Sequence, residues 1–463
     1  MIVIVAEVDE RATDLAQAVR VFLEASVGDW TGRAARMLAT TPEIAGYSFA
    51  TAVVLGDADR VRQEIERDPG VATRSDPGSG WTPLHAVCAS RWHHLDPPRA
   101  DGLLAVARLL LNAHADLEAR APGQGGGRTP LGCACASAST SAGNEPMLRL
   151  LLERGAVPDD QDLYLVGFAG NAHRCLRLLL AHTPNVADTV KWALSAPISL
   201  GDTEGCRLLL EAGADPRRYL DDPPCAVAYA AVRAGCSAEL LELLLAHGAD
   251  LDAPGPDGRS PYRLAVGQGR TDLAALLRQR GAPDDATDSD RFLSACLRAD
   301  RAGAQRQLAD DPGFLDRLTR AEQGAAIVQA AEAGSTTAVA LMLDLGFPID
   351  VRGASDGRTP LHAAAYAGSA ETVRLLLGRG ADVEARDTSW DSTPLDWAAV
   401  GSGQRPRSNS RPDWVATVRT LIEAGGSCDG LTLSSDDPKP PSPEVAQLLR
   451  AHGVGDDHTE SKG

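Results

Sequence analysis

Two adjacent histidines, His93 and His94, are the residues in the sequence that most readily suggest chemistry. They stand beside Trp92 and between Arg91 and Asp96, and imidazole and carboxylate groups are common metal ligands and proton carriers. Neighbouring side chains rarely point at one ion, and no carboxylate stands at a helical ligand spacing from both histidines. Metal binding or catalysis by the Trp92-His93-His94 loop, or by the N-terminal segment, is therefore a remote alternative.

Motifs of the common enzyme classes do not occur in the sequence. It contains no Gly-x-x-x-x-Gly-Lys phosphate loop, no Gly-x-Ser-x-Gly motif and no His-Glu-x-x-His motif. The nine cysteines include no Cys-x-x-Cys pair, which favours buried free thiols in a reducing compartment over disulfides or a zinc site. We therefore predict that the protein is not an enzyme and that it binds no cofactor and no metal.

The charge of the chain limits the partners that it can bind. The formal net charge is −18 and the isoelectric point is near 5.0, whereas nucleic acids and anionic lipids require a dense cationic face. The segment MIVIVAEVDERATD at the N-terminus lacks a basic flank, so it predicts neither a signal peptide nor a membrane span. We expect a cytoplasmic protein that binds no nucleic acid and no membrane, and the scarcity of lysine beside abundant arginine and alanine indicates a bacterial source.

One stretch, DGRTPLHAAAYAGSAETVRLLLGRGADVEARD at 356–387, shows the elements that would have to position any functional residue. Thr359 can cap a helix whose first turn contains Pro360, and apolar residues then recur at spacings of three and four. Gly368 ends this helix, and a second amphipathic helix follows and ends at Gly380. The stretch therefore predicts two helices joined by a tight turn.

The same unit recurs along the chain with a period of 33 to 34 residues, as from Gly248 to Gly281 and from Gly346 to Gly380. With this period and its Thr-Pro-Leu-His motif, the chain resembles the ankyrin repeat family, in the form of a bacterial-type ankyrin repeat domain-containing protein. The resemblance implies an all-α solenoid of stacked helix-turn-helix units with short β-like finger loops. It also implies a structural role for the motif residues Thr82, Pro83, His85, Thr359, Pro360 and His362.

Eleven units are expected between about residues 48 and 427, with atypical segments at both ends. The expected divisions are an N-terminal helix and capping half-unit at 1–47, a first stack at 48–282, a second stack with a truncated C-terminal cap at 292–453, and a disordered tail at 454–463. The acidic segment between the stacks, at 283–291, is either a break or one long finger loop.

Two units carry eleven extra residues each between their helices, in the segments around 91–101 and 404–413. Such insertions cost little closure entropy, so their presence alone does not indicate a function. In the first, Trp92 and Leu95 either fold the loop back onto helix ends or contact a partner. The second is either disordered or recognises an acidic partner. The sequence does not decide whether these insertions bind or are inert.

The remaining surface is the predicted concave face, formed by finger loops and exposed positions of the first helices. By resemblance to the family, this face binds proteins, and we expect a monomeric, non-catalytic scaffold or regulator with one unidentified protein partner. An immunity-type or inhibitor protein for a dedicated partner is the alternative. The expected partner-binding residues are Trp81, Arg259, Arg358, Tyr366, Arg379, Arg386, Trp390 and Asp391.

Overall fold

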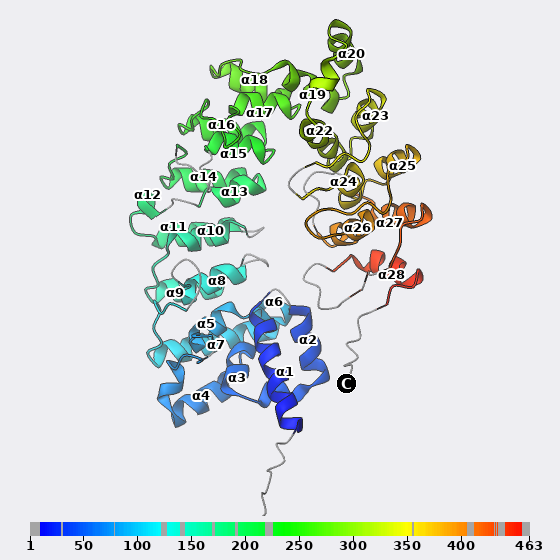
Figure 1. Ribbon diagram of the computed structural model, residues 1–463. Coiled ribbons are helices and arrows are strands. Elements are labelled where there is room, and N and C mark those ends of the chain that lie inside the picture. The colour runs from blue at the N-terminus through cyan, green and yellow to red at the C-terminus, as the bar shows by residue number, and fades with distance from the viewer. Residues whose placement is uncertain are drawn as a thin grey trace, which may run out of the picture. The chain divides into compact units, whose positions relative to one another are not determined.

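The computed structural model of the 463-residue chain forms two compact units, Met1–Pro261 and Tyr262–Gly463 (Figure 1). The structure describes residues 10–28, 31–77, 79–121, 127–138, 144–168, 172–189, 193–217, 226–353, 356–404, 412–429, 431, 433 and 440–455. These residues form helices and no β-sheet, so the predicted all-α class is confirmed. Of the predicted terminal segments, residues 1–9 and 456–463 lie outside the described residues.

The first unit begins with three helices that precede the repeats and continues with six pairs of repeat helices. The preceding helices are α1 (Glu10–Val27), α2 (Thr31–Thr40) and the 3₁₀ helix η1 (Pro42–Gly46). The pairs are α3 (Phe49–Leu55) with α4 (Ala58–Arg67), α5 (Pro83–Ala89) with α7 (Pro97–Asn112), α8 (Pro130–Ala138) with α9 (Glu145–Glu153), α10 (Asp160–Gly167) with α11 (Ala172–His182), α13 (Ser195–Leu200) with α14 (Thr203–Glu211), and α15 (Val227–Arg233) with α16 (Ala238–Ala246). Three short helices lie in connections: η2 (Pro69–Ala72), α6 (Trp92–Leu95) and α12 (Val186–Thr189).

The second unit contains five pairs and a final helix. The pairs are α17 (Pro261–Gly267) with α18 (Thr271–Gln279), α19 (Asp288–Leu297) with α20 (Arg301–Asp310), α22 (Arg320–Glu332) with α23 (Thr336–Asp344), α24 (Pro360–Tyr366) with α25 (Ala370–Gly378), and α26 (Pro394–Ser402) with α27 (Trp414–Glu423). The short helix α21 (Phe314–Arg317) precedes α22, and α28 (Pro443–Ala451) packs on α26 and α27. The eleven pairs among the described residues correspond to the eleven units that the repeat period predicts.

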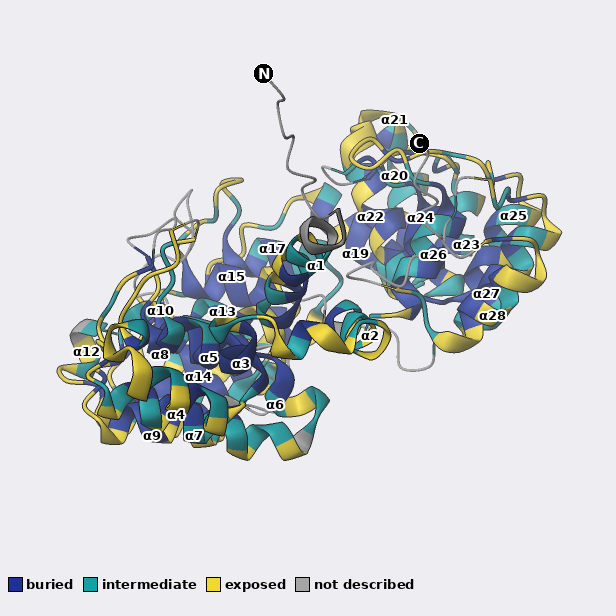
Figure 2. Ribbon diagram, turned by 90° about the horizontal axis from the view of Figure 1, so that it is seen from below, coloured by how far each residue is buried: buried dark blue, intermediate teal, exposed yellow. Residues whose placement is uncertain are grey.

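Helices of the same kind stack on one another within each unit. In the second unit the first helices α19, α22, α24 and α26 contact in series, as do the second helices α23, α25 and α27. The first helices approach closely because small residues line their contacts: Ala363, Ala364 and Ala365 of α24 are fully buried. Figure 2 shows the helix α24 largely in the colour of buried residues. Alanine and leucine thus fill a core in a chain with only 4 % aromatic residues.

The two motif histidines, His85 in α5 and His362 in α24, each join their helix to the next repeat. In α24, the Thr359 backbone N–H donates to Nδ1 of His362 at 3.2 Å, and Nε2 of His362 lies 3.0 Å from the Ser392 carbonyl oxygen. A backbone N–H can only donate, so Nδ1 must be the acceptor and Nε2 must carry the proton. In α5, His85 repeats this pattern, with Nε2 at 3.0 Å from the carbonyl oxygens of Ala119 and Arg128.

The acidic segment 283–291 connects α18 to α19 inside the second unit. Thr287 caps α19, and its backbone N–H donates to Asp290 Oδ2 at 2.8 Å. The same carboxylate pairs with Arg263 of α17 at 2.7 Å. These bonds give the segment a defined local structure, while the division of the repeats into two stacks at 283–291 stays a prediction.

Candidate functional site

An aromatic cluster lies on the first helices α24 and α26 and the finger loop between α25 and α26. Trp397 is its centre: the rings of Trp390, Tyr366 and His362 lie 5.6, 5.7 and 5.9 Å from it, between centroids. The interplanar angles of 65°, 77° and 80° are the edge-to-face arrangement that aromatic rings prefer. We refer to these four residues as the aromatic cluster.

Trp390 is the exposed member of the cluster, with 65 % of its surface open to solvent. Its loop is nevertheless ordered by Asp387, which is only 4 % exposed. One carboxylate oxygen of Asp387 accepts from the backbone N–H groups of Ser389 and Trp390 at 2.8 and 2.7 Å. The other accepts from the Ser392 N–H at 3.1 Å and the Trp397 indole N–H at 2.9 Å. One buried carboxylate therefore holds both the loop and the central ring.

The ionisation of Asp387 follows from these contacts. Burial raises the pKa of Asp387, but the Trp397 indole N–H and the loop N–H donors outweigh burial and hold the pKa below its usual value. The group is therefore a carboxylate at neutral pH, and it accepts from all four donors at once.

Arg358, which lies just before the start of α24, packs against the ring of Trp397. Its guanidinium carbon lies 5.7 Å from the Trp397 ring centroid, a cation–π distance. The same guanidinium lies 3.2 Å from a carboxylate oxygen of Glu332 and 3.5 Å from one of Asp356. The two carboxylates thus hold an arginine of this chain on the central ring.

Arg386 and Asp391 form the outer part of the finger loop. The Arg386 guanidinium donates to the Asp391 carbonyl oxygen and lies 3.4 Å from the Asp391 carboxylate. Asp391 has a positive φ of 52°, a conformation that aspartate tolerates better than most residues. Its side chain is 82 % exposed, so this carboxylate points into solvent directly after Trp390.

The second insertion begins at the edge of the aromatic cluster. The Tyr366 hydroxyl donates to Gln404 Oε1 at 2.7 Å, and the Tyr366 carbonyl accepts from the Trp414 indole N–H at 3.0 Å. Asp413 caps α27 by accepting from a backbone N–H of its first turn. Residues 405–411, which carry the predicted arginines of this insertion, lie outside the described residues.

The structure brings five of the eight expected binding residues together around the cluster: Arg358, Tyr366, Arg386, Trp390 and Asp391. It places the other three elsewhere. Arg379 pairs with Asp344 at 3.0 Å, on the side of the second helices. Trp81 lies in the first unit, with its ring 6.1 Å from His85, and Arg259 pairs there with a neighbouring aspartate at 2.6 Å.

Sequence reasoning missed two residues of the site, Trp397 and Asp387. A signal for Trp397 was present, because it stands four residues after Thr393, at the position where the clearest unit has Ala363. A large ring at a position that holds alanine in the clearest unit indicates that the surface of this first helix differs from that of the other repeat. No sequence signal points to Asp387, because its four donors become neighbours only when the finger loop folds.

The first insertion folds back onto the protein. Trp92 is 4 % exposed, its indole N–H donates to Ser26 Oγ at 3.1 Å, and its ring lies 6.1 Å from Phe22. His93 donates from Nδ1 to the Ser90 carbonyl, and burial lowers its pKa to about 4. The described residues contain no group of three histidine, cysteine or acidic side chains that could hold a metal ion. The insertion thus fixes α1 to the repeats.

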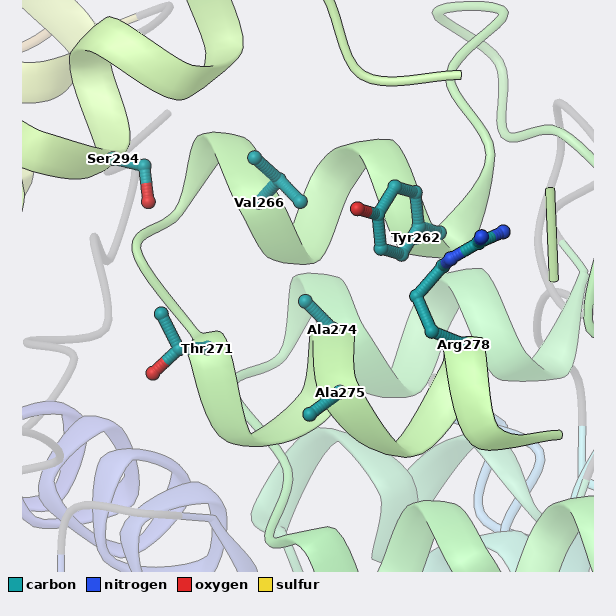
Figure 3. A pocket seen from close by; sticks show the side chains of 7 residues that line it. All are labelled: Tyr262, Val266, Thr271, Ala274, Ala275, Arg278 and Ser294. Atoms are coloured by element: carbon teal, nitrogen blue, oxygen red, sulfur yellow. The ribbon is translucent and has the colours of Figure 1, made fainter. Parts of the chain in front are cut away.

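A shallow pocket of about 250 Å³ lies between α17, α18 and α19 (Figure 3). The Arg278 guanidinium carbon lies 5.7 Å from the Tyr262 ring centroid at one end of this pocket. The lining residues are Tyr262, Val266, Thr271, Ala274, Ala275, Arg278 and Ser294. Its wall is mainly apolar, and it lacks a pair of groups suited to acid–base or nucleophilic chemistry.

Stacked helix pairs with histidine links between consecutive units define a helical repeat protein. The family model described as "Ankyrin repeats (3 copies)" matches residues 294–387, and the model described as "Ankyrin repeat" matches residues 79–122 and 126–163. Residues 79–122, 126–163 and 294–387 of the chain therefore carry ankyrin repeats.

Two other comparisons complete this result. No curated protein matches the chain. Among solved structures, the human ASB11 ankyrin repeat domain is similar at 20 % identity, over 50 % of this chain and 98 % of that chain, with a TM-score of 0.24. A similarity at this score carries no argument about the present chain. Ankyrin repeats generally mediate protein–protein interactions and are typically non-catalytic. No described helix is long and apolar enough to cross a membrane.

Proposed function

We propose that this protein is a non-catalytic interaction scaffold or regulator, which binds a protein partner through the aromatic cluster of its second unit. The observation that carries the proposal is Trp390, a tryptophan that is 65 % exposed although its backbone is fixed by a buried carboxylate. A large apolar ring held in water costs free energy unless a partner covers it. Its position on a finger loop matches the predicted concave binding face.

The surroundings of Trp390 support binding in energetic terms. Tryptophan, tyrosine and arginine are the residue types that most often dominate interface energies, and Tyr366, Arg358 and Arg386 lie around the two tryptophans. The loop is already ordered by hydrogen bonds, so binding loses little conformational entropy there. Such a surface is suited to recognition and has no group placed for catalysis.

The cellular setting is part of the same proposal. The described cysteines are all free and all but Cys428 are buried, which supports a reducing, cytoplasmic compartment. The net charge of −18 supports a partner other than nucleic acid or membrane. We also infer a bacterial source and a monomer. A dedicated inhibitor or immunity protein remains the alternative, and it predicts one captured partner instead of several.

The test is capture of partners by the full-length protein, followed by affinity measurement with Trp390→Ala. The substitution should weaken binding by roughly 1–3 kcal/mol and leave the helical spectrum unchanged. Tyr47→Ala is the matched control, because Tyr47 is also an exposed aromatic residue, at 45 %, but lies in the first unit. Equal affinity of wild type and Trp390→Ala for every captured partner would refute the proposed site.

The second insertion is the competing site. Replacing residues 405–411 by a short glycine-serine linker keeps Gln404, which bonds to Tyr366, and Asp413, which caps α27. If the aromatic cluster is the site, affinity should stay within about twofold, because loop residues outside a contact contribute little beyond closure entropy. Loss of binding with this variant but not with Trp390→Ala would move the site to the insertion.

A further inference from the structure

We propose that the partner presents a basic segment, and that an arginine of this segment lies on the open face of Trp390 with its guanidinium paired to Asp391. The inference rests on the proposed function, because it names the chemistry of the partner that the aromatic cluster binds. The aromatic cluster, its charges and the exposure of Asp391 each support it.

The chain itself provides an example of the proposed contact. Arg358 lies on the ring of Trp397 at 5.7 Å, and Glu332 and Asp356 hold its guanidinium in place. A ring face carries negative charge density, so a cation above it is attracted, most strongly by tryptophan. Trp390 is the neighbouring tryptophan, and 65 % of its surface is exposed, whereas the ring of Trp397 already has Arg358 beside it.

Asp391 supplies the carboxylate that the second contact requires. It follows Trp390 directly in the chain, and its side chain is 82 % exposed. Its carboxylate has only a 3.4 Å contact with Arg386, which is longer than a strong charge-assisted hydrogen bond. The Asp391 carboxylate is also far more exposed than those of Glu332 and Asp356, at 82 % against 34 % and 19 %, so it is the one that a guanidinium from outside can reach.

The formal charges around the aromatic cluster favour a cation over an anion. The carboxylates in the network of bonds and ion pairs around it are Glu332, Asp356, Asp387 and Asp391, and the guanidinium groups in that network are Arg352, Arg358 and Arg386. The excess is one negative charge locally, within a chain whose net charge is −18. This field attracts a basic segment and repels an acidic one before contact.

The experiment titrates the full-length protein with a defined probe, the peptide acetyl-Gly-Arg-Gly-Arg-Gly-amide. The control peptide carries citrulline in place of both arginines, which keeps the shape and removes the charge. Nuclear magnetic resonance of the tryptophan indole N–H groups reports the contact, with the Trp390 resonance assigned from Trp390→Phe. We expect the arginine peptide to shift this resonance and the citrulline peptide to bind at least about fivefold more weakly.

Variants locate the contact. Trp390→Ala and Asp391→Asn should each weaken the arginine peptide roughly fivefold to thirtyfold, and Tyr47→Ala should leave its affinity unchanged. Equal binding of the two peptides, or arginine-peptide binding that is the same in wild type and Trp390→Ala, would overturn the inference. If neither peptide binds while a captured partner still depends on Trp390, the basic-partner inference fails and the proposed function stands.

Discussion

The buried carboxylate of Asp387 accepts a hydrogen bond from the indole N–H of Trp397, with 2.9 Å between Oδ2 and Nε1. This bond ties the finger loop to the first helix of the following repeat. Because the other oxygen of Asp387 binds the backbone of Trp390, one side chain sets the relative position of the two tryptophans. Asp387 is therefore a positioning residue for the proposed surface.

Substitution of Asp387 tests this role. Asp387→Ala leaves four N–H groups without their acceptor, and it should lower the free energy of unfolding by roughly 1–3 kcal/mol. It should also weaken partner binding, because Trp390 loses its fixed position. Chemical denaturation and the line width of the Trp390 amide resonance measure the two effects. Asp387→Asn retains one acceptor oxygen and should recover part of the stability; an alanine variant as stable and as ordered as wild type would contradict the role.

The motif histidine His362 should make stability depend on pH. Burial lowers the pKa of His362 from its usual 6.5, because the folded protein needs a neutral ring whose Nδ1 accepts the Thr359 N–H. The unfolded chain therefore binds the proton more readily, so this stabilisation is present above about pH 6.5 and is lost as pH falls. His362→Ala should cost roughly 1–3 kcal/mol at neutral pH. Unfolding measured across this range should show a smaller loss on acidification in the variant than in wild type.

Asp162 should make stability depend on pH in the opposite direction. It is 3 % exposed, and burial, with the neighbouring Asp159 carboxylate, raises its pKa to about 7. The folded state then binds more protons than the unfolded chain between about pH 4 and pH 7, so the stability contributed by the neutral group falls as pH rises through 7. Asp162→Asn keeps an oxygen that can accept the Asp159 N–H without this cost. At pH 8 the variant should be more stable than wild type by about 1–3 kcal/mol. Equal stabilities at this pH would show that folding does not raise the pKa of Asp162.

Trp92 should anchor helix α1. Trp92→Ala removes a buried ring that contacts Phe22 and Ser26 of α1. We therefore expect the free energy that holds α1 on the repeats to fall by about 3–5 kcal/mol. Hydrogen exchange should rise in α1 first, because the bond from the Arg91 N–H to the Ser26 carbonyl, which also holds the end of α1, lies directly beside the lost ring. Trp390→Ala is the control, since an exposed ring should change exchange in α1 little. Unchanged protection of α1 in the Trp92 variant would rule out the anchor.

The repeat architecture could be predicted because its signals are local. Thr359 and Pro360 begin α24, and Gly380, with a φ of 91°, follows α25, as the spacing of these residues indicates. Caps, turn glycines and apolar stripes act over a few residues, so each helix pair can be recognised from its own segment. The same signals located the finger loop that carries Trp390.

The composition of the surface depended on tertiary contacts that no local pattern encodes. Rings from two other segments, α24 and the finger loop, lie around Trp397, and Arg358 reaches it from the preceding repeat. Trp92 packs on Phe22, seventy residues earlier, so the insertion folds back as an internal anchor, which is one of the two alternatives that the sequence leaves open. Whether a tryptophan is buried or exposed is decided by the helices that stack against it, because solvent exposure is a property of the packed units. The amino-acid sequence by itself determined the helix pairs and their period, and the stacking of repeats decided that Trp92 is covered and Trp390 is open.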